Sequence, residues 1–473
     1  MYFKSLFLLA TARVVLAKVQ FLGVAIAGGD FGCEIDGSCP LGSTQLPNNN
    51  DGVEQMQHFV KDDGLNMLRL PTSWQFLVNN QLGGNLDSTN LAKYDQLMQS
   101  CLATGAHCMI DIHNFARWNG GIIGQGGPSD DQFVSLWSQL AKKYANNQNV
   151  VFELMNEPHD LDIGTWVNTC QKVVTAIRQA GATSQMILLP GTNFDSAATL
   201  ATTGGASQLL GIKNPDGTTD NLILDIHKYL DIDNSGTHSL CTTDNADAFT
   251  SIAQFLRTNG RKGFVSETGA SKDASCLAAF CAQNTLINQN SDVFIGLIGW
   301  GAGSFDTSYL LSLTPSKQNG GLVDNQQMSQ CLLGTWINPN TTDPRAPQSS
   351  SSSSLPSLIL STTAPTSTSL TSLMTASPSA TKTGKSSEPV ITIEINSATS
   401  VLQTASNPTV WTNLIIASGS PSDEPYSIAW ATSTTSQTPT QTHAAASVTA
   451  TGGASSIKAM TFIWSCMILP FLI

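Results

Sequence analysis

The sequence predicts an α/β protein that consists of a (β/α)8 barrel followed by a long segment without a core. Eight apolar runs rich in strand-forming residues begin at residues 21, 65, 107, 149, 185, 221, 263 and 294, a spacing of 31 to 44 residues. Most of the intervals carry apolar residues at helical spacing. In contrast, 48 of the 111 residues from Ala346 to Ser456 are Ser or Thr.

The first segment, Met1–Ala17, has the pattern of a secretory signal peptide. One early cation, Lys4, precedes the apolar run of residues 6–10, and small residues lead up to Ala17. Such a segment is removed from the mature protein and implies an oxidising, extracellular environment. Residues 18–345 are then the catalytic domain.

Near-continuous apolar strands that alternate with helices indicate a parallel sheet. Stripes of the helical kind occur at residues 91–102, 133–144, 166–177 and 249–256. Eight such strand–helix units in about 280 residues favour a closed (β/α)8 barrel. A doubly wound open sheet is the alternative, but no Gly-rich phosphate loop follows the first strand.

The segment from residue 346 to residue 456 is predicted to be a disordered stalk. It has too few periodic apolar residues to offset the entropy of ordering the chain. A composition rich in Ser, Thr and Pro is typical of an O-glycosylated stalk, and an unmodified flexible linker is the alternative.

The last segment, residues 457–473, is apolar and too short to span a bilayer comfortably as a helix. Small residues lie upstream, at 444–447 and 452–456. Together these features match a glycosylphosphatidylinositol attachment signal, with a short tail anchor as the alternative. We therefore expect a secreted protein that is held at the cell surface by a lipid.

Composition excludes several classes of function. The formal net charge is −12 and no basic run occurs, which argues against nucleic acid as a partner. No pair among the seven histidines has a metal-ligand spacing, and no G-x-S-x-G elbow is present. We expect no metal, no cofactor and no protein partner, and a monomeric protein.

In a (β/α)8 barrel, the chemistry lies at the carboxyl ends of the strands. The polar or aromatic residues predicted at those ends are Arg69, His113, Asn114, Asn156, Glu157, His227, Tyr229, Glu267 and Trp300. Glutamate is scarce, with five between residues 18 and 345: Glu34, Glu54, Glu153, Glu157 and Glu267. Glu54 is predicted to lie on a solvated helix face, and Glu153 to lie in the barrel core or in a buried pair.

Only Glu157 and Glu267 end strands, in the short contexts Asn-Glu-Pro and Ser-Glu-Thr-Gly. Two converging carboxyl groups can hydrolyse a glycosidic bond, because one protonates the leaving oxygen while the other attacks the sugar or activates water. A neighbouring Asn156 could hold the 2-hydroxyl of the sugar. The separation of the carboxyl groups distinguishes retention, at about 5–5.5 Å, from inversion, at about 6.5–9.5 Å.

These motifs closely resemble glycoside hydrolase family 5, and within it the fungal secreted endo-β-1,4-glucanases. The resemblance covers about residues 20–336. It rests on the stretches at 154–160 and 265–269, with support from the stretches at 23–28, 69–71, 111–114, 117–121 and 300–306.

The resemblance implies a retaining mechanism on cellulose and related β-glucans, with Glu157 as general acid/base and Glu267 as nucleophile. It also implies supporting roles: Arg69 and Tyr229 orient and ionise Glu267, Asn156 holds the 2-hydroxyl, His113 and His227 support the site, and Trp300 stacks under the sugar. Two further rings, Trp74 and Trp118, follow strands in polar loops and are predicted to stack on sugar faces. Trp137 and Trp166 are predicted to be core.

Nine of the ten cysteines lie in the predicted barrel. Cys33 with Cys39 and Cys101 with Cys108 would close short loops, and the resemblance suggests the pairs Cys241–Cys276 and Cys281–Cys331. Cys170, on an apolar helix stripe, is then left as a buried free thiol.

Other functions remain open at this point. The same barrel could have another family 5 specificity, as a mannanase, a β-1,3-glucanase or a transglycosylase. A non-catalytic surface protein that binds glycans is a second class, although both Glu contexts are intact.

Overall fold

The computed structural model describes residues 18–48 and 50–337. The predicted signal peptide, stalk and apolar tail therefore lie outside the described residues. Within the described part, no helix is both long enough and apolar enough to span a membrane.

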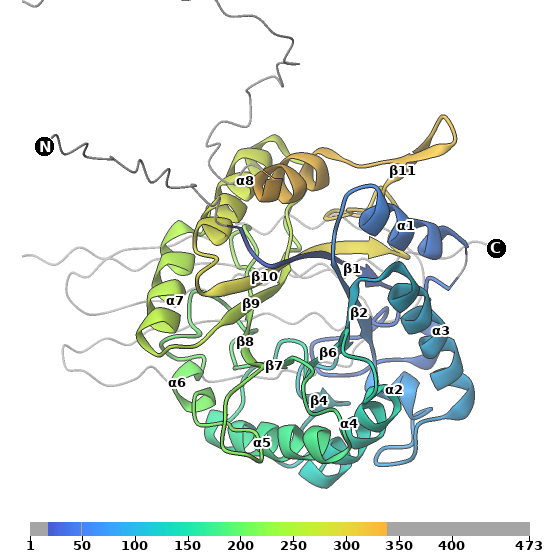
Figure 1. Ribbon diagram of the computed structural model, residues 1–473, viewed down its shortest axis with the longest axis vertical. Helices are drawn as coiled ribbons and strands as arrows, with labels where there is room; N and C mark the ends of the chain where they lie inside the picture. The colour runs from blue at the N-terminus through green and yellow to red at the C-terminus, as the bar shows by residue number, and fades with distance from the viewer. Residues whose placement is uncertain (1–17, 49, 338–473) are drawn as a thin grey trace, which may run out of the picture. The chain divides into compact units, whose positions relative to one another are not determined.

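Eight parallel strands form a closed barrel, and helices surround it (Figure 1). The order around the barrel is β1-β10-β9-β8-β7-β6-β3-β2, so the chain runs once around the ring. The barrel strands are β1 (Phe21–Ala27), β2 (Met67–Thr72), β3 (His107–Ile112), β6 (Val150–Glu153), β7 (Ile187–Leu189), β8 (Leu222–His227), β9 (Gly263–Thr268) and β10 (Phe294–Gly303). Each lies within two residues of the start that the sequence predicts, and the barrel prediction is confirmed.

The helices of the described residues are α1 (Asn50–Lys61), α2 (Trp74–Leu77), α3 (Ser88–Thr104), α4 (Asp130–Tyr144), α5 (Ile163–Gln179), α6 (Ala206–Leu209), α7 (Ala246–Thr258), α8 (Ala274–Gln289) and α9 (Thr335–Ile337). The four predicted stripes are α3, α4, α5 and α7. Side-chain caps begin several of them: Ser129 and Gln132 form a capping box at α4, and Asp162 caps α5. A 3-10 turn (Leu41–Ser43), a π-helix (Gln327–Gly334) and two hairpins complete the fold: β4 (Arg117–Trp118) with β5 (Gly121–Ile122), and β11 (Ser316–Gln318) with β12 (Gly321–Val323).

Two hydrophobic cores hold the barrel together. The larger lies between strands and helices and contains Trp137 and Trp166, both fully buried as predicted. The smaller fills the inside of the barrel with side chains from alternate positions of the strands. Its innermost members include Met67, Met109, Val151, Leu188, Ile223, Phe264 and Ile298.

The described structure contains four disulfides, Cys33–Cys39, Cys101–Cys108, Cys241–Cys276 and Cys281–Cys331. These are the four predicted pairs. Cys170 is a buried free cysteine on α5, also as predicted.

One tryptophan prediction is wrong. Trp74 is fully buried at the start of α2, where its ring packs edge-on against Trp118 at 5.3 Å and near Phe133 at 5.5 Å. Ser73 caps this short helix and turns the following residue toward the core. The ring of Trp74 therefore offers no face to a sugar. Trp118 is only partly buried, in the β4–β5 hairpin.

Candidate active site

The layers inside the barrel change from apolar to polar over one step along the strands. Side chains two residues apart on a strand point to the same side, so each inner apolar residue is followed by an inner residue nearer the carboxyl end. Six strands contribute such a pair, an inner apolar residue and the residue two positions later: Met67 and Arg69, Met109 and Asp111, Val151 and Glu153, Ile223 and Asp225, Phe264 and Ser266, and Ile298 and Trp300. This second layer is the floor of the site. His113 and His227 follow one further step along β3 and β8.

Arg69 is the centre of that floor and is completely buried. Its guanidinium contacts both carboxylate oxygens of Glu153, with Nε at 2.7 Å and Nη2 at 2.5 Å. The same Nη2 lies 2.9 Å from Asp111 Oδ2 and donates to Asn156 Oδ1 at 2.8 Å, while Nη1 donates to Glu267 Oε2. Glu153 thus takes part in a buried pair, one of the two arrangements predicted for it.

Glu267, in β9, is held by two side chains and is almost fully buried. Besides the contact with Arg69, its Oε1 accepts a hydrogen bond from the hydroxyl of Tyr229 at 2.7 Å. Burial alone would raise the pKa of this carboxyl, but the positive charges of Arg69, His227 and His113 outweigh it and lower the pKa to about 2. Glu267 is therefore ionised at any ordinary pH.

Glu157 follows β6 and has a different environment. Its Oε1 lies 2.9 Å from Nδ1 of His227, and 17% of its side chain is exposed. Its backbone has a φ of +47°, and Asp195 Oδ2 accepts its backbone N–H at 3.2 Å. Asp195 also accepts the N–H of Gly191 at 2.5 Å, so it ties the loop after β7 to the strand end that carries Glu157.

His227 lies between the two glutamates. Its Nδ1 is 2.9 Å from Glu157 Oε1 and 4.0 Å from Glu267 Oε1, and one oxygen of each glutamate lies within 4.8 Å of the other. Burial opposes a charge on the ring, but the carboxylates of Glu267 and Glu157 outweigh burial and raise the pKa of His227 to about 10. The spacing of Glu157, His227 and Glu267 would suit a metal ion, but the positive charge on the protonated imidazole of His227 would repel one.

Trp300, in the floor layer, packs against His113, which lies one step nearer the carboxyl ends of the strands. The two rings are stacked, with centroids 5.5 Å apart and planes 15° from parallel. His113 Nδ1 lies 2.7 Å from Asp111 Oδ2, and Trp300 donates its indole N–H to the hydroxyl of Tyr309 at 3.1 Å. The peptide bond between Trp300 and Gly301 is cis.

The structure thus brings together eight of the ten predicted site residues: Arg69, His113, Asn156, Glu157, His227, Tyr229, Glu267 and Trp300. It does not bring Trp74 or Trp118 to this cluster. Sequence reasoning missed Asp111, Asp195 and Asp225. The second-layer spacing, two residues after an inner apolar residue, could have identified Asp111 and Asp225, whereas no spacing rule points to Asp195.

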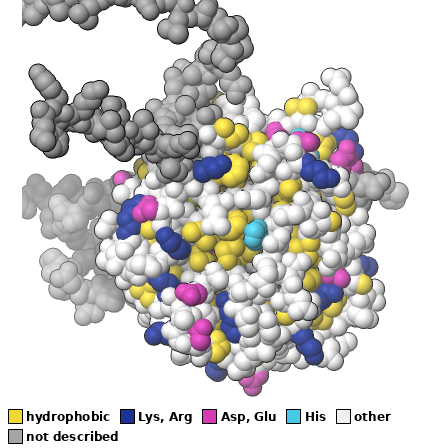
Figure 2. Space-filling view, viewed as in Figure 1, with side chains coloured by type: hydrophobic (Ala, Val, Ile, Leu, Met, Phe, Trp, Pro, Cys, Tyr) yellow, Lys and Arg dark blue, Asp and Glu magenta, His cyan; other side chains and the backbone are white. Residues whose placement is uncertain are grey.

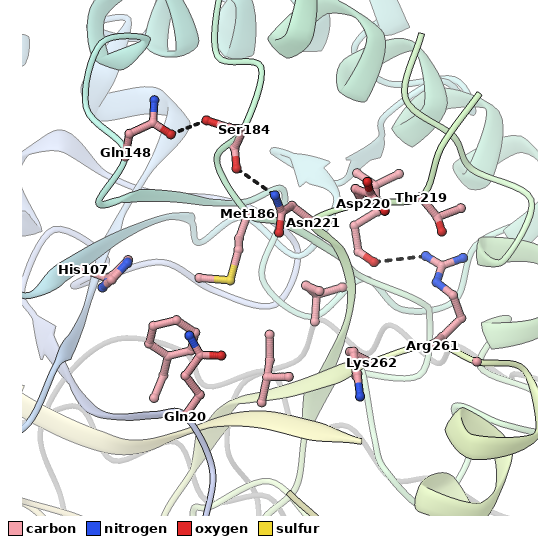
Figure 3. A pocket seen from close by; sticks show the side chains of 15 residues that line it. Gln20, His107, Gln148, Ser184, Met186, Thr219, Asp220, Asn221, Arg261 and Lys262 are labelled. Atoms are coloured by element: carbon pink, nitrogen blue, oxygen red, sulfur yellow. Dashed lines mark hydrogen bonds between the residues drawn. The ribbon is translucent and has the colours of Figure 1, made fainter. Parts of the chain in front are cut away.

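A cavity of about 450 Å³ lies elsewhere, at the opposite end of the barrel (Figure 3). Its lining comes from residues that begin or immediately precede the strands, among them Gln20, His107, Met186 and Asn221. None of the predicted site residues lines it. We place the candidate site at the carboxyl ends, because the ionisable groups with specific charge partners are there.

A (β/α)8 barrel with two close carboxylates at the carboxyl ends of its strands is the architecture of a glycoside hydrolase. The chain belongs to glycosyl hydrolase family 5, because the cellulase model of that family matches residues 34–305.

Named relatives agree with this assignment. The chain is 56% identical over 323 residues to endoglucanase EG-II of Hypocrea jecorina, covering 66% of this chain and 77% of that protein. It is 49% identical over 320 residues to endoglucanase 1 of Saitozyma flava, covering 67% of this chain and 89% of that protein. The crystal structure of Cel5A (EG2) from Hypocrea jecorina superposes with a TM-score of 0.66 at 55% identity, covering 67% of this chain and 98% of that one.

The lowered pKa of Glu267 makes a prediction about stability. A carboxyl with a lowered pKa in the folded state stabilises the fold above its ordinary value of 4.5, and this contribution is lost as pH falls toward 2. We expect the stability advantage of the wild type over Glu267→Gln to shrink by about 2 kcal/mol between pH 5 and pH 3. Urea unfolding at both pH values measures it.

The exposed Glu54, which lies 3.1 Å from Lys317, provides the matched control through Glu54→Gln. That variant should track the wild type at both pH values. A wild-type advantage over Glu267→Gln that is equal at pH 5 and pH 3 would contradict the assigned ionisation of Glu267.

Proposed function

We propose that this protein is a retaining endo-β-1,4-glucanase. The observation that carries the proposal is the approach of Glu157 and Glu267, which have carboxylate oxygens within 4.8 Å of each other. Such a spacing suits a direct attack on the sugar and leaves too little room for the water that an inverting enzyme places between them. The choice of β-1,4-glucan is supported by the two similar proteins named as endoglucanases.

In the first step Glu267 attacks the anomeric carbon. Its ionised carboxylate forms an ester bond to that carbon while the bond to the glycosidic oxygen breaks. Glu157 gives its proton to the departing oxygen, which leaves as the hydroxyl of the shortened chain. Arg69 and Tyr229 hold Glu267 in its charged form and aim it before the reaction, which is the preorganisation that lowers the barrier.

In the second step a water molecule displaces Glu267 from the anomeric carbon. Glu157, now a carboxylate, takes a proton from water as the water oxygen bonds to the anomeric carbon. The ester bond to Glu267 breaks, and both glutamates return to their starting states. Two displacements on the same carbon return the original anomeric configuration.

The remaining residues act on the sugar. Asn156 is buried, its Oδ1 is held by Arg69, and its Nδ2 has no partner among the described residues, so this amide nitrogen is available to the 2-hydroxyl. Trp300 provides an aromatic face for the sugar at the cleaved bond. His113 supports Trp300 by stacking against it, and Trp118 remains a proposed contact for more distant sugars.

The simplest test is the release of new reducing ends from carboxymethylcellulose, with the anomer of the first product followed by NMR. We expect rapid loss of viscosity and a β-anomeric product. Activity confined to mannan or β-1,3-glucan would move the enzyme to another specificity of the family. Products longer than the substrate would indicate a transglycosylase, and binding without turnover would indicate a non-catalytic glycan-binding protein.

The assigned roles predict opposite responses to the leaving group. Glu157→Ala should lose about 10²–10⁴-fold on cellulose and much less on an aryl cellobioside with an acidic phenol, because that phenolate leaves without a proton. Glu267→Ala removes the attacking group, so both substrates should suffer alike. Steady-state kinetics on the two substrates measure this. If Glu267→Ala retains activity on the activated substrate while Glu157→Ala does not, the roles are reversed.

We further propose that the protein is secreted and lipid-anchored at the cell surface. The support is the composition of residues 1–17, of the Ser/Thr-rich residues 346–456 and of the apolar residues 457–473. Phosphatidylinositol-specific phospholipase should release the full-length enzyme from membranes. Full-length enzyme found free in the medium with its apolar tail intact would contradict the anchor.

A further inference from the structure

A line of hydrogen bonds continues behind His227, away from the substrate side. Nε2 of the ring lies 3.0 Å from Ser266 Oγ, and the hydroxyl of Ser266 donates to Asp225 Oδ1. Ser266 and Asp225 are completely buried, and 1% of the His227 side chain is exposed. The line therefore joins a deeply buried carboxylate in β8 to Glu157 through two side chains.

The chemistry of the groups gives this line a direction. Asp225 Oδ1 accepts two hydrogen bonds, one from the hydroxyl of Ser266 and one from the backbone N–H of Ile226 at 3.0 Å. The hydrogen of Ser266 is therefore committed to Asp225, and the lone pairs of Ser266 Oγ face His227. Only a protonated Nε2 can satisfy them, which leaves Nδ1 as the nitrogen that shares its proton with Glu157.

We propose that Asp225 and Ser266 are positioning residues for the general acid: they hold a proton on Nε2 of His227, so that the proton the ring can give up is the one on Nδ1, toward Glu157. This inference rests on the proposed function of Glu157. The proton moves from Nδ1 to the Glu157 carboxylate and from there to the glycosidic oxygen, while Nε2–H stays in place. The ring becomes neutral, and it recovers its charge when Glu157 takes a proton from water in the second step.

Without this constraint the neutral ring could keep its proton on Nδ1 and lose it from Nε2. Such a ring would donate to the Glu157 carboxylate and hold it charged, with no proton to give to the leaving group. The line from Asp225 excludes that arrangement. His227 accordingly works as a directed proton store next to Glu157.

The carboxyl groups around His227 come from three strands, β6, β8 and β9, and from the loops after β6 and β7. They are Glu153, Asp225 and Glu267 on the strands and Glu157 and Asp195 in the loops, and the guanidinium of Arg69 lies behind Glu153 and Glu267. Glu267 and Glu157 favour the charged ring most, and Asp225 adds to them, against the opposing effect of burial. Removing the Asp225 charge should therefore let the ring lose its proton at a lower pH.

The test compares Asp225→Asn and Ser266→Ala with the wild type in pH profiles of kcat/KM. On cello-oligosaccharides we expect the alkaline limb to move down by about one pH unit in both variants. On an activated aryl cellobioside, which needs no proton in the first step, the limb should stay within a few tenths of a unit. Thr169→Val is the matched control, because it also removes a buried hydroxyl that donates to an aspartate, Asp130 at 2.6 Å, but does so on α5 outside the barrel.

A second measurement does not depend on activity or on a stable variant. In ¹⁵N-histidine NMR of the wild-type protein, the His227 ring should titrate near pH 10 and carry its remaining proton on Nε2 above that value. A neutral ring protonated on Nδ1, or unchanged alkaline limbs in both folded variants, would overturn the proposal. A wild type that titrates as expected but does not cleave glucans would instead overturn the proposed function alone.

Discussion

The structure of the site depends on one buried cation. Arg69 meets Asp111, Glu153 and Glu267 on three other strands of the barrel, and it reaches Asn156 beyond the end of β6. Carboxylates removed from water are costly unless a well-placed partner compensates them, and the planar guanidinium provides several donors in fixed directions. Because all of these side chains must reach the same guanidinium, the contacts of Arg69 also require the register of β2, β3, β6 and β9.

The two glutamates at the strand ends, Glu157 and Glu267, have different surroundings because they lie at different positions relative to Arg69. Glu267 faces Arg69 and a tyrosine hydroxyl, which favour its charged form. Glu157 lies toward solvent, and its side-chain partner is His227, which can exchange a proton. The asymmetry is a property of the floor beneath them rather than of the glutamates themselves. A nucleophile and an acid can thus be made from one residue type at the ends of two strands.

Much of this arrangement could be predicted from the sequence, and the failures have physical causes. The strand spacing and the two short Glu contexts were sufficient for the barrel and its reactive end. Asp111 and Asp225 lie two residues after an inner apolar residue, but that spacing identifies them only when the inner face of each strand is known. Asp195 acts through a loop backbone, which no spacing marks. Trp74 was misplaced because the polarity of its neighbours does not determine the direction in which a short helix turns its side chains.

On the face that Figure 2 shows, acidic and basic side chains are interspersed around hydrophobic ones, in keeping with the absence of a basic run in the sequence.

The central claim is that Glu267 attacks the sugar and that Glu157 does not. The most direct measurement is to trap the covalent intermediate with a 2-deoxy-2-fluoro cellobioside that carries a good leaving group, and to locate the label by peptide mass spectrometry. The fluorine slows both steps by destabilising the positive charge at the anomeric carbon, and the good leaving group restores the first. We expect one glycosyl group per chain, esterified to Glu267 and released when an acceptor sugar is added. A label on Glu157, or turnover with inversion and no label, would contradict the account.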